Sequence, residues 1–555
     1  MKYVKLTQSQ LATIASNSGM KRYLESLLEG KDFTPRSWLY EDLDPDVILD
    51  KWIAHLSTLE NSPIEEESEV FQFDISQKAK WGPQGGVRPI SELSDIIEEG
   101  FRLGTSPIPD FFKSDAWRYA KQYCIDYLTS RSGFNLPGTL RPASFRHVVD
   151  DMRARDTLES NSGWPLFTRR NKPEVIKESI RAAQSYEYKD YPAIALFRNY
   201  NNKTRLVWMF PMSTNLVEGS YLQPLQSALM KVVERTPVLA GREYASLNFY
   251  SPWIGFERVR EWVTSAYDNG MFLTATDFSS TDAHFNHWAT SEVCDVIEHA
   301  FQPEFRDGLR GSMMHMHKIP LIVGPDRMLV GAHGVSSGSN WTNFVETVFD
   351  WIVQVAYRFF LSDERYVRRS RILPTTGNSL GYAIGDDMTW MTEDYSEDFA
   401  SELEEFAKLV GQIVKAEKAS NSRDKVKSLQ RLFQRGYRRP QDGYLRAVYP
   451  TVRALKSLVF PERFHDPRKW SKDMFAIRCF MILENCVDHP LFVEFVRFVC
   501  AGNPYLTEFA KKSGGQQNEL FRQSKLLPGL NPTYNQERRD SSIRTFESIR
   551  IAREL

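Results

Sequence analysis

The stretch GYAIGDDMTW, residues 381–390, places two adjacent carboxylates inside a run that alternates like a β-strand. Its apolar and aromatic residues (Tyr382, Ile384, Met388 and Trp390) recur at every second position, as in a half-buried strand. A solvated hairpin turn is the simplest explanation for Asp386 and Asp387. A chemical role requires that the rest of the chain supply partners for these two acids.

The chain has 555 residues, which is more than one hydrophobic core accommodates, so we expect several subdomains. Lys plus Arg number 70 and Asp plus Glu number 71, so attraction for a polyanion must come from local patches. Residues 423–439 form a basic run, which is either a solvated face or a surface that tracks a nucleic-acid backbone. Residues 65–69 form an acidic run, which we interpret as a solvated helix face.

Five cysteines without CxxC or Cys/His ligand spacing indicate a reducing compartment. The N-terminus, MKYVKLTQSQ, has no apolar segment typical of a secretory signal. The most apolar helix candidate, residues 344–361, is interrupted by Glu346, Asp350 and Arg358 and is too polar to span a bilayer. We therefore expect a soluble, intracellular protein.

The pattern along the chain mixes helices with short strands and predicts an α+β fold. Residues 193–197 and 205–210 read as strands joined by the polar turn 199–204, and 271–276 as a further strand. The strongest helix prediction is 343–361, capped by Thr342 or Asn343. A helix over 396–414 and a strand over 428–433 follow, and the pattern is mainly helical from residue 441. The tail, 536–555, is either a loose arm or a docked helix.

A second acidic motif, ATDFSSTD, ends the strand 271–276 with Asp277 and places Asp282 five residues later. If this strand lies beside the 381–390 hairpin in one antiparallel sheet, Asp277 and Asp386 meet at strand ends. Clustered carboxylates repel one another unless a divalent cation neutralises them, and Mg²⁺ suits such oxygen ligands. Two such ions can assist an in-line phosphoryl transfer. The alternative is two unrelated acidic turns.

Two further motifs lie near these acids in the sequence. In GVSSGSNWTNFVE, Ser337 and Gly338 precede the long helix, whose first amides and hydroxyls can hold a sugar or phosphate. In RNYNNKTRLVW, the cations Arg198, Lys203 and Arg205 can hold a triphosphate. Taken alone, the first is an ordinary capped helix and the second a surface hairpin. The sequence contains no GxxxxGK[ST] phosphate-binding loop.

The ordered set KTR, DFSSTD, SGSNWT and GDD resembles motifs F, A, B and C of viral RNA-dependent RNA polymerases, most of all those of picobirnaviruses, relatives of the partitivirus-like double-stranded RNA viruses. This resemblance spans residues 198–390. NSGWPLF, residues 161–167, resembles the template-entry motif G. VKAEK, residues 414–418, followed by SLQRLF, resembles motifs D and E.

The resemblance implies roles for individual residues. Metal ligands would be Asp277, Asp386 and Asp387, and Lys418 would donate a proton to pyrophosphate. Residues implied to contact the nucleotide are Arg198, Lys203, Arg205, Asp282, Ser337, Gly338, Thr342 and Asn343. Glu346 departs from the family, which often has Asn or Asp there, so its part in the ribose network is open.

The resemblance also implies a right-hand polymerase with fingers, palm and thumb that adds ribonucleotides to a template and releases pyrophosphate. The implied segments are an N-terminal extension bridging fingers and thumb (1–70), fingers (71–234), palm (235–294), a return to the fingers (295–333), palm (334–440), and thumb with C-terminal tail (441–555). A reverse transcriptase is the alternative enzyme, but it usually has an aromatic residue at the Asp282 position. A non-catalytic viral RNA-binding protein is the remaining alternative.

Further expectations concern cofactors, partners and location. The resemblance implies two Mg²⁺ ions, with Mn²⁺ as a substitute, and RNA template, RNA product and ribonucleoside triphosphates as partners. We also expect a monomer that does not bind membranes, contact with a capsid protein, and a location in the virion interior and host cytoplasm. Its task would be to replicate and transcribe a segmented double-stranded RNA genome.

The remaining motifs are expected to be structural. HMH, residues 315–317, alternates like a strand without nearby carboxylates, which favours a core role over a metal site. The Trp and Phe residues of 341–360 are expected to form core.

Overall fold

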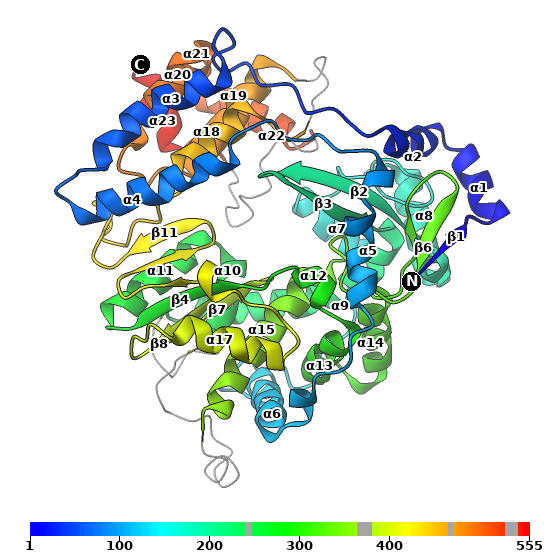
Figure 1. Ribbon diagram of the computed structural model, residues 1–555. Helices are drawn as coiled ribbons and strands as arrows, with labels where there is room; N and C mark the ends of the chain where they lie inside the picture. Colours follow the sequence, from blue (N-terminus) through cyan, green and yellow to red (C-terminus); the bar gives the residue numbers. More distant parts are fainter. Residues whose placement is uncertain (239–246, 363–379, 464–469, 528–541) are drawn as a thin grey trace. The chain divides into compact units, whose positions relative to one another are not determined.

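The computed structural model describes the chain except for residues 239–246, 363–379, 464–469 and 528–541. The chain divides into two compact units. The first comprises Met1–Glu29, Arg88–Leu196 and Leu206–Val426, and the second comprises Gly30–Val87, Phe197–Arg205 and Lys427–Leu555. Helices and mostly antiparallel strands form the protein (Figure 1), which confirms the predicted α+β class. The division into polymerase segments stays a prediction.

Among the described helices of both units, none combines the length and the apolar character that a membrane span requires.

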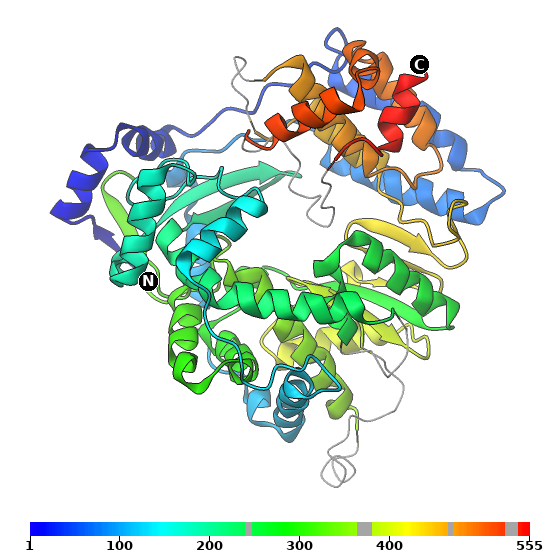
Figure 2. The same ribbon diagram turned by 180° about the vertical axis from the view of Figure 1, so that it is seen from behind.

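The first unit holds most of the strands, and Figure 2 shows the same elements from behind. Its main elements are β1 (Lys2–Lys5), α1 (Gln8–Ala15), α2 (Ser18–Glu29), α5 (Ser94–Leu103), α6 (Asp115–Thr129), α7 (Phe145–Ala154), α8 (Pro173–Gln184), β2 (Ala193–Tyr200), β3 (Lys203–Met209), α9 (Met212–Arg235), α10 (Ser251–Ile254), α11 (Phe256–Asp268), β4 (Phe272–Asp277), α12 (Thr281–His284), α13 (His287–Ile297), α14 (Arg306–His315), β5 (Leu321–Ile322), β6 (Arg327–Val330), α15 (Trp341–Phe360), β7 (Tyr382–Ile384), β8 (Asp387–Thr392), α17 (Phe399–Leu409) and β9 (Ser420–Asn421).

Two sheets organise these elements. One has the strand order β1-β6-β5-β2-β3, and the other has the order β7-β8-β4-β9. The second sheet packs against helices through aromatic side chains: Tyr357 of α15 meets Trp390 edge-on at 5.7 Å between ring centroids, and Trp262 of α11 meets Tyr382 at 4.9 Å. Such edge-to-face pairs add to the area buried by each ring. Large buried aromatic side chains therefore fix β7 and β8 to the helices α11 and α15.

The strand and helix predictions hold in position and differ at the ends. The strand predicted at 271–276 is β4, and the helix predicted at 343–361 is α15. The hairpin strands β2 and β3 extend into the predicted turn because only Asn201 and Asn202 take left-handed backbone angles, which Asn tolerates. The predicted cap of α15 is wrong: Asn340 is the capping position.

Two other predictions are corrected. Residues 428–433 are not one strand, because Leu429 and Gln430 take left-handed angles and turn the chain between β10 (Lys425–Ser428) and β11 (Arg431–Gln434). The HMH motif is not a strand, because α14 ends at His315. Its core role is confirmed for His317, which is 1% exposed and whose ring nitrogens lie 2.7 Å from Thr290 Oγ1 and 3.0 Å from the His333 carbonyl.

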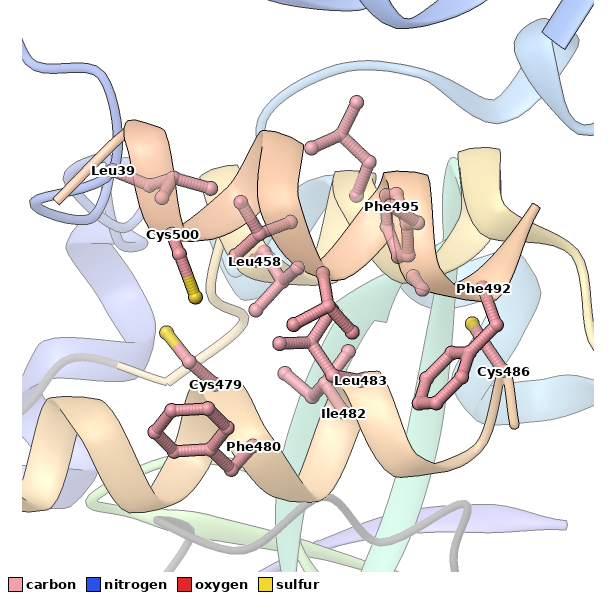
Figure 3. Close-up of a cluster of buried hydrophobic side chains, with 14 of the residues drawn as sticks. Leu39, Leu458, Cys479, Phe480, Ile482, Leu483, Cys486, Phe492, Phe495 and Cys500 are labelled. Atoms are coloured by element: carbon pink, nitrogen blue, oxygen red, sulfur yellow. The ribbon is translucent and has the colours of Figure 1, made fainter. Parts of the chain in front are cut away.

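The second unit is built mainly from helices around one apolar core (Figure 3). Its core includes the thiols of Cys479, Cys486 and Cys500, and Cys124 and Cys294 are buried in the first unit. The elements of the second unit, apart from the strands above, are α3 (Pro45–Leu56), α4 (Glu65–Ile75), α18 (Thr451–Val459), α19 (Lys472–Glu484), α20 (Phe492–Ala501), α21 (Tyr505–Ala510), α22 (Gly514–Ser524) and α23 (Glu547–Arg553).

Two buried acids hold helix ends together inside the second unit. Asp74, at the end of α4, accepts hydrogen bonds from the backbone amides of Thr451 (3.0 Å) and Val452 (2.8 Å) at the start of α18. Glu484 accepts from the amides of Glu547 (3.0 Å) and Ser548 (2.9 Å) at the start of α23. Free amides at a helix start need such partners. The C-terminal residues 547–553 are therefore a docked helix, one of the two alternatives for the tail.

We predict that the buried histidines make the first unit sensitive to acid. Burial lowers the pKa of His317 to about 3 and that of His333 to about 4. Below pH 6.5 the unfolded chain binds protons that the folded chain excludes, so stability falls as pH drops, by up to about 1.4 kcal/mol per pH unit for each histidine. His317→Asn should flatten the decline in Tm between pH 7 and pH 5. His147→Asn, at an exposed position, is the control; equal slopes in the two variants would contradict the prediction.

Candidate active site

Strand pairing brings the two acidic motifs together. In the register of β4 and β8, Asp277 lies opposite Asp387. On the other side of β8, Ile384 pairs with Asp387, so Gly385 and Asp386 form the turn of the β7–β8 hairpin. The expected antiparallel sheet is confirmed, and the acids gather at one end of it.

The three strand-end acids offer the donor set that a magnesium ion prefers. Asp277 and Asp387 are exposed, and Thr281 Oγ1 lies 3.0 Å from Asp386 Oδ2. Among the described residues, no three His, Cys, Asp or Glu side chains converge as a complete protein-made metal site would. Magnesium usually keeps several water or phosphate ligands, so a few accessible carboxylates fit it.

Helix α15 fixes the hairpin that carries Asp386. The Gly385 amide donates to Thr347 Oγ1 (2.9 Å), and the Gly381 amide donates to Gln354 Oε1 (2.9 Å). Gly385 has φ +57°, and a Cβ there would lie 3.2 Å from Asn343 Oδ1. Backbone angles of this kind favour glycine. The backbone of the hairpin is thus held by two side chains of α15, Thr347 and Gln354.

Asp282 and Glu346 form a carboxyl–carboxylate pair joined by a hydrogen bond. One of the two must carry a proton, since an ionised carboxylate only accepts. Burial raises the pKa of Glu346 well above its usual range, and the charges of Asp282 and Asp386 add to this. Glu346 is 3% exposed, whereas Asp282 is exposed. We therefore assign the proton to Glu346, which makes it a donor toward Asp282.

Asp350 is a further acid near the site that the sequence analysis did not assign. It is 1% exposed, and neither carboxylate oxygen has a hydrogen-bond partner among the described residues. Burial raises its pKa well above the usual range, and the charges of Asp386 and Asp387 add to this. Burial therefore favours the protonated, uncharged form of the Asp350 carboxyl. The sequence does contain a signal for this residue, because an acid in the middle of an apolar helix is unusual. Asp350 was considered above only as evidence that the helix does not span a membrane.

The loop before α15 and the first turn of that helix contain several predicted nucleotide contacts. Ser337 and Asn343 are exposed, as a ligand contact requires, and Gly338 is partly exposed. Thr342 is buried, and its hydroxyl donates to the Ser336 carbonyl. Thr342 therefore shapes the loop from inside. The roles of these four residues toward a ribose stay predictions.

The predicted triphosphate-binding cations lie at the hairpin end of β2 and β3, in the segment Phe197–Arg205 that belongs to the second unit. Arg198 makes a two-pronged ion pair with Glu462, with nitrogen–oxygen distances of 2.8 and 2.7 Å. The Arg205 guanidinium lies 4.0 Å from the ring centroid of Tyr200, and Lys203 is exposed. Glu462 already neutralises Arg198, so of the two arginines Arg205 is the better placed for a new anion.

Other cations surround Arg205 in the same unit, and none of them belongs to a predicted motif. Lys456 donates to Asn201 Oδ1 at 2.9 Å. Burial, together with the charges of Arg453, Lys80 and Arg205, lowers the pKa of Lys456 to about 8. A set of like charges of this kind is typical of anion-binding surfaces. Its members are far apart in sequence, which is why no local pattern reveals it.

The remaining candidates occupy different environments. Lys418 is exposed at the end of a short 3-10 helix, Ala416–Lys418, which precedes β9. Within the basic run, Arg439 pairs with Asp442 (2.5 Å), and Arg423 lies 4.7 Å from the ring centroid of Tyr395. These contacts favour a structural role for part of that run.

Comparison with known proteins identifies the class of this site. Residues 200–444 match the family model of viral RNA-dependent RNA polymerases. The match includes the strands and the hairpin that carry Asp277, Asp386 and Asp387. A potential RNA-dependent RNA polymerase of a human picobirnavirus (strain Human/Thailand/Hy005102/-) is 24% identical over 508 residues, which cover 88% of this chain and 85% of the relative.

Solved structures show the same fold. The crystal structure of the RNA-dependent RNA polymerase of a human picobirnavirus superimposes with a TM-score of 0.77 at 20% identity, covering 99% of this chain and 100% of that one. An insertion-loop deletion mutant of such a polymerase gives 0.74 at 21% identity, covering 94% and 97%. The right-hand polymerase fold is therefore confirmed. The chain is an RNA-directed RNA polymerase, an enzyme class that uses divalent metal ions, RNA and nucleotides.

We predict that Glu346 lowers the stability of the folded polymerase at high pH. Its raised pKa means that the folded chain holds a proton that the unfolded chain releases above about pH 4.5. Stability therefore falls as pH rises above that value. Glu346→Gln keeps the shape without the proton, so its Tm without metal should exceed the wild-type Tm at pH 8 and converge with it at pH 5. A benefit of 1 kcal/mol corresponds to roughly 2–4 °C. Glu25→Gln, at an exposed position in α2, is the control; a constant difference in Tm across pH would refute the assignment.

Proposed function

We propose that this polymerase replicates and transcribes a segmented double-stranded RNA genome of a virus by two-metal nucleotidyl transfer. The observation that carries the mechanism is the register that sets Asp277 opposite Asp387, with Asp386 in the adjoining turn. The likeness to picobirnavirus polymerases supports the genome type. A monomer in the virion interior and host cytoplasm, in contact with a capsid protein, completes the proposal.

Asp277 and Asp386, with Asp387 beside them, would hold two Mg²⁺ ions, or Mn²⁺ in their place. When bound, such ions lower the pKa of a 3′-hydroxyl and stabilise the charge on attacking and leaving oxygens. The chain itself prepares this site by presenting carboxylates from adjacent strands, whose spacing is fixed by backbone pairing. Lys418 would supply the proton that pyrophosphate takes as it leaves.

We assign contacts with the incoming nucleotide to residues of three predicted motifs. Lys203 and Arg205 would contact the triphosphate, because a guanidinium and an ammonium offer charged hydrogen bonds to phosphate oxygens. Asp282 would accept a hydrogen bond from the ribose 2′-hydroxyl. The bond from Glu346 would orient Asp282 for this purpose. Ser337 is exposed on the loop before α15, and Asn343 is exposed in the first turn of that helix.

An acceptor at residue 282 favours RNA synthesis over reverse transcription. A reverse transcriptase usually excludes the 2′-hydroxyl with an aromatic ring, whereas Asp282 offers it a partner. Ribonucleotide addition without a primer, tested with purified protein, RNA template and Mg²⁺, would define how synthesis begins.

The two-metal assignment predicts that Asp386→Asn abolishes synthesis while the protein still folds and binds RNA. Loss of one anionic ligand weakens metal binding near both reacting oxygens, which is expected to lower the rate on the order of 10³-fold. The rate is measured by primer extension, and folding by Tm. Asp394→Asn, an exposed acid just beyond β8, is the matched control and should extend primers normally. Near-normal turnover of Asp386→Asn would refute the assignment.

The ribose assignment predicts that Asp282→Ala loses preference for ribonucleotides. In the wild type a ribonucleotide gains a hydrogen bond to Asp282 that a deoxynucleotide cannot make, whereas alanine offers this bond to neither. The ratio of kcat/KM for ATP over dATP, measured on one annealed primer–template, should fall by roughly 10- to 100-fold. An unchanged ratio in a variant that still extends primers would exclude ribose sensing by Asp282.

A further inference from the structure

The loop 336–340, between β6 and α15, is held closely on one side by β3 and the end of α14. Ser336 Oγ donates to the Met316 carbonyl (2.9 Å), and the Trp208 amide donates to Ser337 Oγ (3.3 Å). A Cβ at Gly338 would lie 1.5 Å from the Trp208 carbonyl oxygen. Contact this close admits only glycine. The loop is therefore pressed against β3.

A buried carboxylate holds the other side of this loop. Glu218 of α9 is 1% exposed, and it accepts hydrogen bonds from Ser339 Oγ and the Asn340 amide, the latter at 3.1 Å. Ser339 Oγ in turn accepts from the Trp341 amide (3.1 Å). Because Asn340 makes no side-chain cap, Ser339 and Glu218 together satisfy the first free amides of α15.

The same carboxylate is connected to the segment that resembles a template-entry motif. Asn215 Nδ2 donates to Glu218 Oε1 (2.9 Å) and to the Gly338 carbonyl (3.2 Å). Asn215 Oδ1 accepts from Arg170 Nη2 (2.8 Å), and Arg170 Nε donates to the Asn161 carbonyl (3.2 Å). One chain of hydrogen bonds thus joins residues 161–170 to the loop 336–340.

Burial of the Glu218 carboxylate costs folding free energy unless its oxygens accept hydrogen bonds. Burial raises the pKa of Glu218 to about 7, while the hydrogen bonds from Ser339, Asn340 and Asn215 and the charge of Arg170 oppose that rise. A buried charge persists only where it is hydrogen-bonded and paired. A leucine or methionine would fill the same volume in α9 without this cost, so Glu218 points to a requirement other than packing.

We propose that Glu218 is a positioning residue for nucleotide addition, which holds the loop 336–340 and couples it to the template-entry segment 161–170. This inference rests on the proposed function, in which Ser337 and the start of α15 face the nucleotide. Glu218 itself does not touch substrate in this scheme. It sets the conformation from which Ser337 and Asn343 act.

The test compares Glu218→Ala and Glu218→Gln with a control on the same helix. Gln226→Leu is the control, because Gln226 is buried in α9 and bonds only to Tyr250 Oη (2.9 Å) among the contacts described. Hydrogen exchange is measured on peptides that cover 334–346 and 159–170, without substrate. Steady-state kcat and KM for ribonucleotides are measured on an annealed primer–template.

Glu218→Ala should speed exchange in both peptides and raise KM for all four ribonucleotides by roughly tenfold, with a smaller change in kcat. Glu218→Gln should recover part of the loss, because its amide oxygen still accepts from Asn340. Gln226→Leu should leave KM and the exchange rates of both peptides unchanged, even if it lowers Tm as much as Glu218→Ala does. If Glu218→Ala does not fold, Ser339→Ala removes the same contact from the other side.

If hydrogen exchange in the 334–346 peptide of Glu218→Ala stayed at the wild-type rate, Glu218 would not hold the loop 336–340. Faster exchange with an unchanged KM would overturn its role in nucleotide addition. A double variant, Glu218→Gln with Ser339→Ala, should be no worse than the more damaging single variant, because both act on one contact; additive losses in KM would overturn the proposal. If the wild type failed to extend primers at all, the proposed function would be wrong. The exchange data would still show whether Glu218 holds the loop 336–340.

Discussion

The pairing of β4 with β8 is the constraint on which the site depends. Side chains alternate faces along a strand, so a slip of one residue would turn Asp277 away from Asp387. Backbone hydrogen bonds from Gly381 and Gly385 to Gln354 and Thr347 of α15 prevent such a slip on the hairpin side. The position of the acids is therefore set by polar groups in an otherwise apolar helix, and a purely hydrophobic α15 would pack as well without fixing the register.

The same helix explains why the site tolerates so many acids. Glu346 and Asp350 are buried, and burial raises the pKa of each carboxyl well above its usual range, which disfavours further negative charge beside Asp386. The carboxylates of Asp277 and Asp387 are exposed, so ions and phosphates can reach them from solvent. The site thus combines exposed carboxylates at the strand ends with buried carboxyls behind them, whose burial disfavours ionisation. In the loop before the helix, Glu218 represents a third case, a buried carboxylate surrounded by donors.

Local sequence patterns predicted the parts of this arrangement that depend on periodicity. The strand at 271–276, the helix at 343–361 and the hairpin at 381–390 were predictable because alternation and helical spacing are local properties. The cap of α15 was predicted wrongly because its amides are satisfied by Ser339 and by Glu218, which lies more than a hundred positions earlier. Glu218 and Lys456 carry no signature in sequence, since their environment is made by tertiary contacts. The strand predicted at 428–433 failed because Leu429 and Gln430 rarely take left-handed angles, so no turn was expected.

All five cysteines are buried, and burial raises the pKa of each thiol. Maleimides and similar reagents attack the accessible thiolate, so the native thiols react slowly. The unaltered chain is therefore a ready background for site-specific labelling. A single cysteine placed at an exposed position, such as Glu25 of α2, would take a fluorophore ahead of the native five, without replacement of any core residue. Dyes attached in this way would report the movements of the polymerase as it copies RNA.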